Sequence, residues 1–207
     1  MNVNMKVLQK KIKVDNIILW GFCILCGLVI LFHINQINQY SRMNNSSFEV
    51  KLGPTDTKNN TYNYYLYIDG KQYYPVDYND YGRLDENGKP NVKANIILDH
   101  LNGIVKSILI EIIFIFLYGM LSEVRNGITP FSMRNVFRLR IIAVLSFFVA
   151  LLPVAVNIIF SIIVFQFVAF EFSSLNFYII SIGVVFGIIS EIFKYGYVLQ
   201  EDMDQIA

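Results

Sequence analysis

Four long runs of the chain are made mostly of apolar residues and are separated by polar segments. An α-helix rises about 1.5 Å per residue, so about 20 residues cross the roughly 30 Å hydrocarbon layer of a bilayer. The runs cover residues 17–34, 103–121, 141–170 and 172–190. The pattern therefore predicts transmembrane helices over residues 16–34, 103–121, 141–161 and 175–197.

The third run is too long for one untilted crossing, and it contains Pro153 and Asn157. Proline removes a backbone donor and bends a helix, so we expect this span to end near Ser161. Residues 162–174 then form an outer lip or a kinked continuation of the helix.

Residues 35–102 are polar and rich in tyrosine, and they are long enough to fold in water. The stretch "FEVKL", Phe48–Leu52, alternates apolar and charged residues as a strand does. Residues 62–76 predict a hairpin, because Asp69 and Gly70 suit a tight two-residue turn, and Pro75 favours an edge strand. The tyrosines are expected to pack in this small sheet at the membrane interface, or to form a face that binds a peptide or sugar. The predicted fold class is an all-α membrane protein with four transmembrane helices and a small β-rich extracytoplasmic insertion between the first two.

Positive charge is distributed asymmetrically, although the net charge of the 207 residues is only +1. Residues 1–15 carry four lysines against one acid, and residues 122–140 carry four arginines against one acid. The connection between the third and fourth spans carries only Glu171. Lysine and arginine resist translocation, so we expect both termini and residues 122–140 on the cytoplasmic side. No cleavage motif follows the first run, which we interpret as an uncleaved anchor.

The cytoplasmic loop at residues 122–140 contains signals for the start of a helix. Ser132 can cap a helix, with Phe131 and Val136 packed together as a hydrophobic staple. A start at Thr129-Pro130 is the alternative. The helix would then run directly into the third span.

Charged residues of this loop and of the acidic tail, residues 198–207, lie on the same predicted side of the membrane. The arginines can meet lipid phosphates, or they can bind an acidic cytoplasmic partner. The candidate partner-binding residues are Arg134, Arg138, Arg140, Glu201, Asp202 and Asp204.

Polar residues within the spans raise a second hypothesis, because an ionised side chain costs about 2.5–3.5 kcal/mol at the centre of a bilayer. Lys106, Glu111 and Asn157 can form a polar cluster that carries a proton or holds a solute. Alternatively, Glu111 is neutral and serves helix packing. Glu191 is expected near the inner surface, where it can pair with Arg125, Arg138 or Arg140.

No catalytic residue, cofactor or metal site is predicted, and we do not expect an enzyme. Cys23 and Cys26 lie in the first span without a further cysteine, and we interpret them as unreactive buried thiols. His33 and His100 flank the outer segment without a plausible nucleophile nearby.

Two binding functions are also disfavoured. Residues 77–88 begin like a calcium loop, but Tyr81 and Gly88 occupy positions that require oxygen ligands. Direct nucleic-acid binding is not expected, because the basic residues adjoin membrane spans and the tail is acidic.

The order "NGITPFSMRNVFRLR", a pair of long apolar spans and then "SEIFKYGYVLQEDMD" resembles a family of small bacterial membrane proteins catalogued as domain of unknown function 2975. The likeness covers roughly residues 103–204. Its most specific elements are Gly127, Pro130, Phe131, Asn135, Leu139, Glu191, Gly196, Leu199, Glu201 and Asp204. The resemblance implies four spans in a bacterial plasma membrane. Members are often encoded beside a small helix-turn-helix DNA-binding protein, which implies a membrane partner for a transcription regulator.

These observations lead to three hypotheses of function. The first is a non-enzymatic membrane regulator or sensor that restrains a cytoplasmic helix-turn-helix transcription regulator through the arginine loop and the acidic tail. The second is an immunity or self-protection protein against a membrane-active extracellular peptide, with the outer tyrosine segment as a decoy. The third is a small transporter that uses Glu111.

Overall fold

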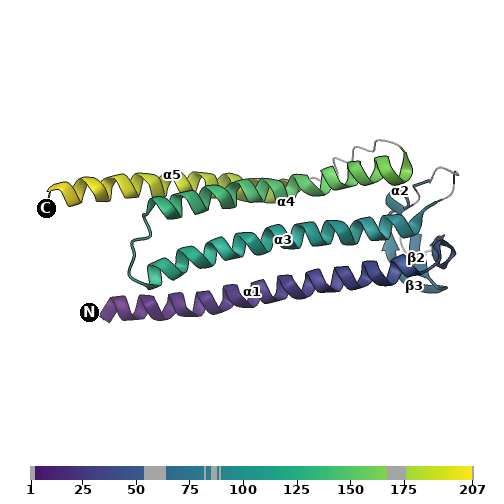
Figure 1. The fold of residues 1–207 in the computed structure, drawn as a ribbon, viewed down its shortest axis with the longest axis horizontal. Coiled ribbons are helices and arrows are strands. Elements are labelled where there is room, and N and C mark those ends of the chain that lie inside the picture. Colours follow the sequence, from purple (N-terminus) through teal and green to yellow (C-terminus); the bar gives the residue numbers. More distant parts are fainter. Residues whose placement is uncertain are drawn as a thin grey trace, which may run out of the picture. The chain divides into compact units, whose positions relative to one another are not determined.

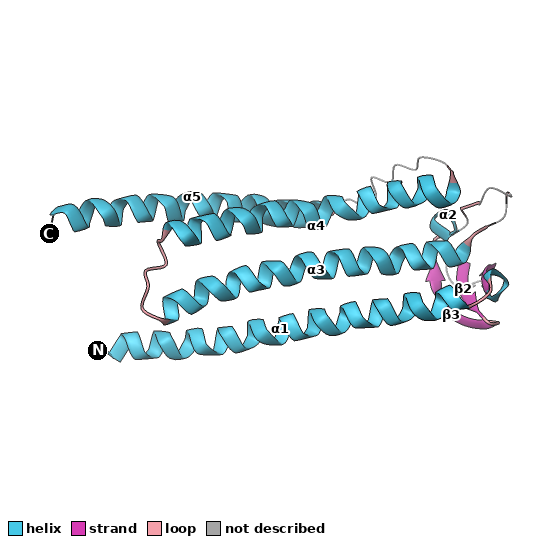
Figure 2. Ribbon diagram, viewed as in Figure 1, coloured by secondary structure: helices cyan, strands magenta, loops and turns pink. Residues whose placement is uncertain are grey.

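Four long α-helices make up most of the chain (Figure 1, Figure 2). The computed structural model describes residues 3–53, 64–81, 83–84, 88, 90–166 and 176–206. The long helices are α1 Val3–Arg42, α3 Val92–Arg125, α4 Met133–Phe165 and α5 Phe177–Ile206. Each is long and apolar enough to cross a membrane. The predicted fold class, four apolar helices with a small sheet between the first two, is confirmed.

All four helices extend beyond the spans predicted from the apolar runs, and α5 continues past residue 197 to Ile206. Helix α1 continues past residue 34, and α3 begins before residue 103. Helix α4 passes through Pro153 and beyond Ser161, where we expected the span to end. The remainder of the predicted outer lip, residues 167–174, lies outside the described residues.

The chain divides into two compact units, and α1, α3 and α4 contribute residues to both. The first unit comprises Met1–Ile30, Val105–Pro153 and Phe172–Ala207. The second comprises Leu31–Ile104 and Val154–Glu171.

The second unit contains an antiparallel three-stranded sheet in the order β1-β2-β3. Its strands are β1 Phe48–Leu52, β2 Tyr64–Ile68 and β3 Lys71–Val76. The predicted strand at β1 and the predicted two-residue turn are both confirmed. Asp69 and Gly70 have φ angles of 49° and 75°, which are the positive values that such a turn requires. Pro75 lies in the edge strand β3, beside an irregularity in its pairing with β2.

The core of this unit forms where the sheet meets the extended helices. It consists of Phe48, Leu66, Ile68, Tyr81, Val92 and Ile96. Val92 and Ile96 are one helical turn apart, so α3 begins early enough to place two apolar side chains in this core. Helix α1 extends for the same reason, because Tyr40 packs edge to face on Phe48 with ring centroids 5.7 Å apart.

Tyrosines contribute to this core in different degrees. Tyr81, in the short helix α2 Tyr78–Tyr81, is buried and its hydroxyl donates a hydrogen bond to Asp99. Burial, followed by the nearby Asp99 carboxylate, raises the pKa of Tyr81. Tyr73 and Tyr74 in β3 are 53% and 46% exposed and do not join the core. These two tyrosines therefore lie in the sheet but outside its core, and their place at the membrane interface stays a prediction.

Helices α1 and α3 approach closely within the second unit. The Nδ1 atoms of His33 and His100 are 2.8 Å apart, and Tyr40 stacks on His100. A Cβ atom at Gly103 would lie 2.4 Å from the His33 ring. A larger residue at position 103 would therefore force the His33 ring to move away.

We predict that Leu66→Ala loosens the sheet, because Leu66 is fully buried and its truncation leaves a cavity. Such a change costs about 2–5 kcal/mol. The β1 and β2 amides should exchange with deuterium faster than in the original protein, as measured by mass spectrometry. Tyr73→Ala, an exposed change in the same sheet, should leave these amides unaffected, and equal exchange in the two variants would refute the assigned core.

Candidate functional site

The turn that ends α3 has a geometry fixed by Gly127. The Gly127 amide donates to the carbonyl of Val124, and the Ile128 amide donates to the carbonyl of Glu123, both at 3.1 Å. Gly127 has a φ of +82°. These bonds and this angle define a Schellman motif, which satisfies the last carbonyls of a helix. The α3–α4 loop, residues 126–132, therefore leaves the helix in a defined direction.

Helix α4 starts at the predicted cap. The Asn135 amide donates to the Ser132 Oγ atom at 3.2 Å, and α4 begins at the next residue, Met133. The alternative start at Thr129-Pro130 is wrong, because the Thr129 hydroxyl oxygen accepts the Phe131 amide at 3.2 Å within the loop.

Asn135 is a buried polar residue in the first turn of α4, next to the α3–α4 loop. Its side chain has no exposed surface, donates to the Pro130 carbonyl at 3.1 Å and accepts from Arg138 at 3.0 Å. A buried amide is tolerated only when its donor and acceptor are both used. Asn135 therefore ties the loop to the first turns of α4.

Two of the three candidate arginines converge on one carboxylate. Glu123, whose side chain is only 11% exposed, accepts Arg134 at 3.0 Å and Arg138 at 2.9 Å. Arg138 also passes over Gly119, where a Cβ atom would lie 3.2 Å from its guanidinium carbon. These ion pairs join the end of α3 to the first turns of α4 and so stabilise the loop between them, although the Arg134 side chain remains 72% exposed.

The third arginine joins α4 to α5. Arg140 donates to Glu191 at 2.6 Å, which confirms one of the three pairings predicted for Glu191. Both side chains are about half exposed, so this ion pair contributes little to stability where water reaches it.

Helix α5 packs on the loop through an aromatic side chain and a glycine. The Phe131 ring, which we assigned to a staple with Val136, lies edge to face on Phe193 of α5 with centroids 5.2 Å apart. A Cβ atom at Gly196 would lie 2.6 Å from the Phe131 ring. The Thr129 hydroxyl also donates to Gln200 at 2.9 Å. Loop and tail are therefore held in a defined arrangement.

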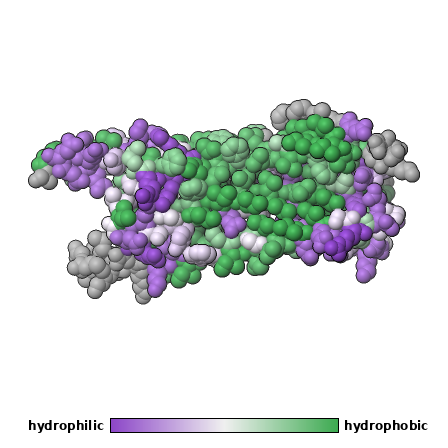
Figure 3. Space-filling view, in the orientation of Figure 1, coloured by the Kyte–Doolittle hydropathy of each residue, from purple (hydrophilic) through white to green (hydrophobic). Residues whose placement is uncertain are grey.

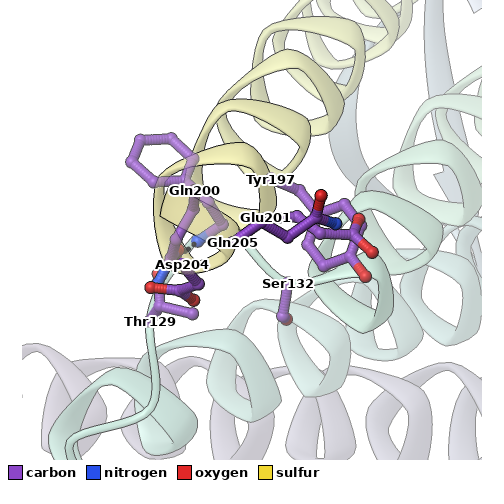
Figure 4. Close-up of a pocket in the computed structure, with 8 residues that line it drawn as sticks. Thr129, Ser132, Tyr197, Gln200, Glu201, Asp204 and Gln205 are labelled. Carbon is purple, nitrogen blue, oxygen red and sulfur yellow. Dashed lines mark hydrogen bonds between the residues drawn. The ribbon is translucent and has the colours of Figure 1, made fainter. Parts of the chain in front are cut away.

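A cavity of about 370 Å³ lies between the loop and the last turns of α5, and we call it the tail cavity (Figure 4). Its lining residues are Thr129, Phe131, Ser132, Tyr197, Gln200, Glu201, Asp204 and Gln205. They supply two carboxylates, three hydroxyls and two amides, and none of them is basic. The arrangement suits a ligand or partner side chain that is cationic and donates hydrogen bonds.

The tail itself is exposed and has two different sides. Within the part of the chain that the structure describes, no ion pair engages Glu201, Asp202 or Asp204. Figure 3 shows these last turns of α5 as hydrophilic, in contrast to the hydrophobic surface of the preceding helices. An apolar stripe on the same turns, the tail stripe, is 45–86% exposed and consists of Tyr195, Leu199, Met203 and Ile206.

The predicted intramembrane cluster is not formed as proposed. Asn157 accepts a hydrogen bond from Asn102 at 2.6 Å, a partner that the sequence did not suggest. Lys106 and Glu111 form no ion pair in the described structure. Glu111 instead lines a cavity between α1 and α3.

The described residues also offer no group of three or more His, Cys, Asp or Glu side chains that could hold a metal ion. Cys23 and Cys26 are free thiols. The candidate calcium loop that we rejected, residues 77–88, is only partly within the described ranges.

The model of one protein family matches residues 55–206. Its description is "Protein of unknown function (DUF2975)". The chain belongs to this family. The match contains the whole α3–α4 loop, the tail cavity and α5, and it begins well before residue 103, where we placed the start of the likeness. The second and third strands of the sheet therefore also lie within the DUF2975 match. No curated protein and no solved structure matches the chain.

Sequence reasoning missed several residues that hold the α3–α4 loop against the neighbouring helices of this DUF2975 protein. Glu123 entered only as a charge, although its carboxylate binds two arginines. The hydrogen bond between Thr129 and Gln200 gave no signal, because uncharged polar pairs distant in sequence have no pattern. Gly127 and Gly196 were recognised through the resemblance alone, and the structure supplies a physical reason for each.

We predict that Gly196→Ala destabilises the protein, because the added methyl group would collide with Phe131. Gly187→Ala is the matched control on the same helix, since its Cβ would meet nothing within 4 Å. Alanine is favoured over glycine in a helix by about 1 kcal/mol, so Gly187→Ala should raise the midpoint of thermal unfolding while Gly196→Ala lowers it. A higher midpoint of thermal unfolding in both variants would contradict the close contact between Phe131 and Gly196.

We also predict that Glu123→Gln lowers stability by about 2 kcal/mol or more, because two arginines lose their shared, largely buried carboxylate. Glu191→Gln removes a solvent-exposed partner of a single arginine and should have a much smaller effect. Unfolding in denaturant of the purified variants measures the difference. Similar losses in both would show that the burial of Glu123 does not matter.

Proposed function

We propose that this DUF2975 protein is a membrane-anchored, non-enzymatic regulator that binds and restrains a basic cytoplasmic helix-turn-helix transcription regulator. The binding surface is the tail cavity together with the acidic side of the last turns of α5. The observation that carries the proposal is a defined cavity with two carboxylates and no basic lining residue.

Charge supports this choice of partner. A DNA-binding domain carries lysine and arginine on the face that contacts phosphate. Carboxylates at Glu201 and Asp204, with hydroxyls at Thr129, Ser132 and Tyr197, can accept hydrogen bonds from such side chains. A regulator held in this way presents the same basic face to the membrane protein and to DNA, so the two compete for it.

The topology that the proposal requires follows from the asymmetry of positive charge. Four arginines adjoin the α3–α4 loop and four lysines lie near the start of α1. Because such residues remain on the cytoplasmic side, the loop and the tail would meet the cytoplasm together.

The arginines have a different role in this proposal from the one we first considered. Arg134 and Arg138 are bound to Glu123, and Arg140 is bound to Glu191. They hold the loop and α5 in place, so that the carboxylates of the tail are presented to the partner. The docking surface is thus acidic, and its support is an internal network of ion pairs.

The direct test uses full-length protein that carries an affinity tag. The protein is purified from bacterial membranes, and the amount of partner recovered with it is measured. We predict that the double change Glu201→Gln and Asp204→Asn reduces the recovery of a helix-turn-helix protein about tenfold or more, since charge-assisted hydrogen bonds contribute about 1.5–3 kcal/mol each. Transcripts controlled by that protein should change in parallel.

Asp202→Asn provides the matched control. Asp202 lies between the two lining carboxylates in sequence but does not line the cavity, so its neutralisation should leave recovery nearly unchanged. If all three acids contribute equally, the surface attracts the partner by net charge alone and the cavity has no specific role. If no DNA-binding protein is recovered with the original protein, the proposed function is wrong.

A further inference from the structure

A second cavity of about 380 Å³ lies between α1 and α3, within the apolar stretches of both helices. It is lined by Trp20, Cys23, Glu111, Ile115 and Tyr118, and we call it the aromatic pocket. Its volume is in the range of sites that hold small organic molecules. The Trp20 and Tyr118 rings meet edge to face, with centroids 5.8 Å apart, and form one wall.

Glu111 is the acidic residue of this pocket, and within the described part of the chain no basic side chain pairs with it. The described residues provide no ion pair or hydrogen bond to its carboxylate. Lys106, the other charged residue in this part of α3, is exposed and does not line the pocket. An isolated carboxylate in a hydrocarbon layer is costly, so an ionised Glu111 requires a cation from outside the chain.

The walls define what kind of cation fits. Trp20 and Ile115 are 56% and 55% exposed, so the pocket opens on the surface that faces lipid. Aromatic faces attract cations, and a tryptophan face attracts them most strongly. An inorganic ion would lack the several oxygen ligands that it needs, since the lining offers one carboxylate and one phenolic hydroxyl.

We propose that the aromatic pocket binds a lipophilic organic cation, which enters from the bilayer and places its charge on Glu111 and its apolar body against Trp20 and Tyr118. The occupant is a monocation with an apolar body rather than a lipid chain, because a lipid chain would leave the carboxylate without a counter-charge. This site is separate from the tail cavity and does not depend on the proposed regulator.

The chain provides its own reporter for the test. Trp20 is the only tryptophan among the 207 residues, so intrinsic tryptophan fluorescence comes from a wall of the pocket. Full-length protein in lipid vesicles, which add no tryptophan of their own, is titrated with tetraphenylphosphonium as the probe. We predict a saturable change in Trp20 fluorescence, and affinity about tenfold or more lower in Glu111→Gln, in keeping with the loss of one charge-assisted contact.

Two controls separate charge recognition from simple partitioning. Triphenylphosphine oxide, a neutral molecule of similar apolar character, should bind the original protein about tenfold more weakly than the cation. This comparison needs no mutation, so it remains decisive if Glu111→Gln does not fold. Glu201→Gln, a change of the same type in the tail cavity, should leave binding of the cation unaltered.

Equal binding of the neutral and cationic probes would overturn the proposal and identify the pocket as an apolar crevice for lipid. Unaltered affinity in a folded Glu111→Gln protein would overturn it as well. Recovery of the cytoplasmic partner, measured in the same variants, tests the other site. If the original protein fails to bind the cation but recovers the partner, only the aromatic pocket proposal fails; if it binds the cation but recovers no partner, only the proposed function fails.

Discussion

A lipid hydrocarbon layer offers no hydrogen-bond partner to a backbone amide or carbonyl, and the architecture of this chain depends on that constraint. Within each long helix the backbone satisfies itself, so the difficult positions are the helix ends. The chain meets this difficulty between α3 and α4 with a Schellman motif at Gly127 and a cap at Ser132. The connection of only a few residues thus leaves few backbone groups without a partner.

The same concentration of polar groups at helix ends explains why the candidate docking surface lies at the loop and tail. Buried Asn135 bonds to Pro130 and Arg138, and the shared carboxylate of Glu123 pairs with Arg134 and Arg138. The carboxylates of the tail receive no such partner within the described structure. The arginines are therefore engaged by Glu123 and Glu191, whereas the carboxylates of the tail have no ion-pair partner among the described residues.

Local chemistry was sufficient to predict some of these features. The strand at Phe48–Leu52, the turn at Asp69 and the cap at Ser132 each depend on residues that are neighbours in sequence. The four apolar helices could be predicted because the length of a span is fixed by the thickness of the bilayer.

Contacts between distant segments could not be predicted in the same way. Helix α3 begins at Val92 because its first turns pack on a sheet, and composition does not reveal that contact. Asn102 bonds to Asn157, and Lys106 forms no ion pair with Glu111 among the described residues. Both results depend on the rotation of each helix about its axis. The tail cavity requires Phe131 to sit on Gly196, a contact between residues 65 positions apart.

The tail stripe and the acids of the tail belong to one continuous helix whose earlier turns are apolar. Starting a helix is the expensive step in its formation, and segments shorter than about 12–15 residues rarely stay helical alone in water. In α5 the apolar turns already form a helix, so the final turns only extend it and need no nucleation of their own. The apolar turns thereby fix the conformation of the acidic turns that follow them, and the same stretch released as a free peptide would lose the spatial order of its charges.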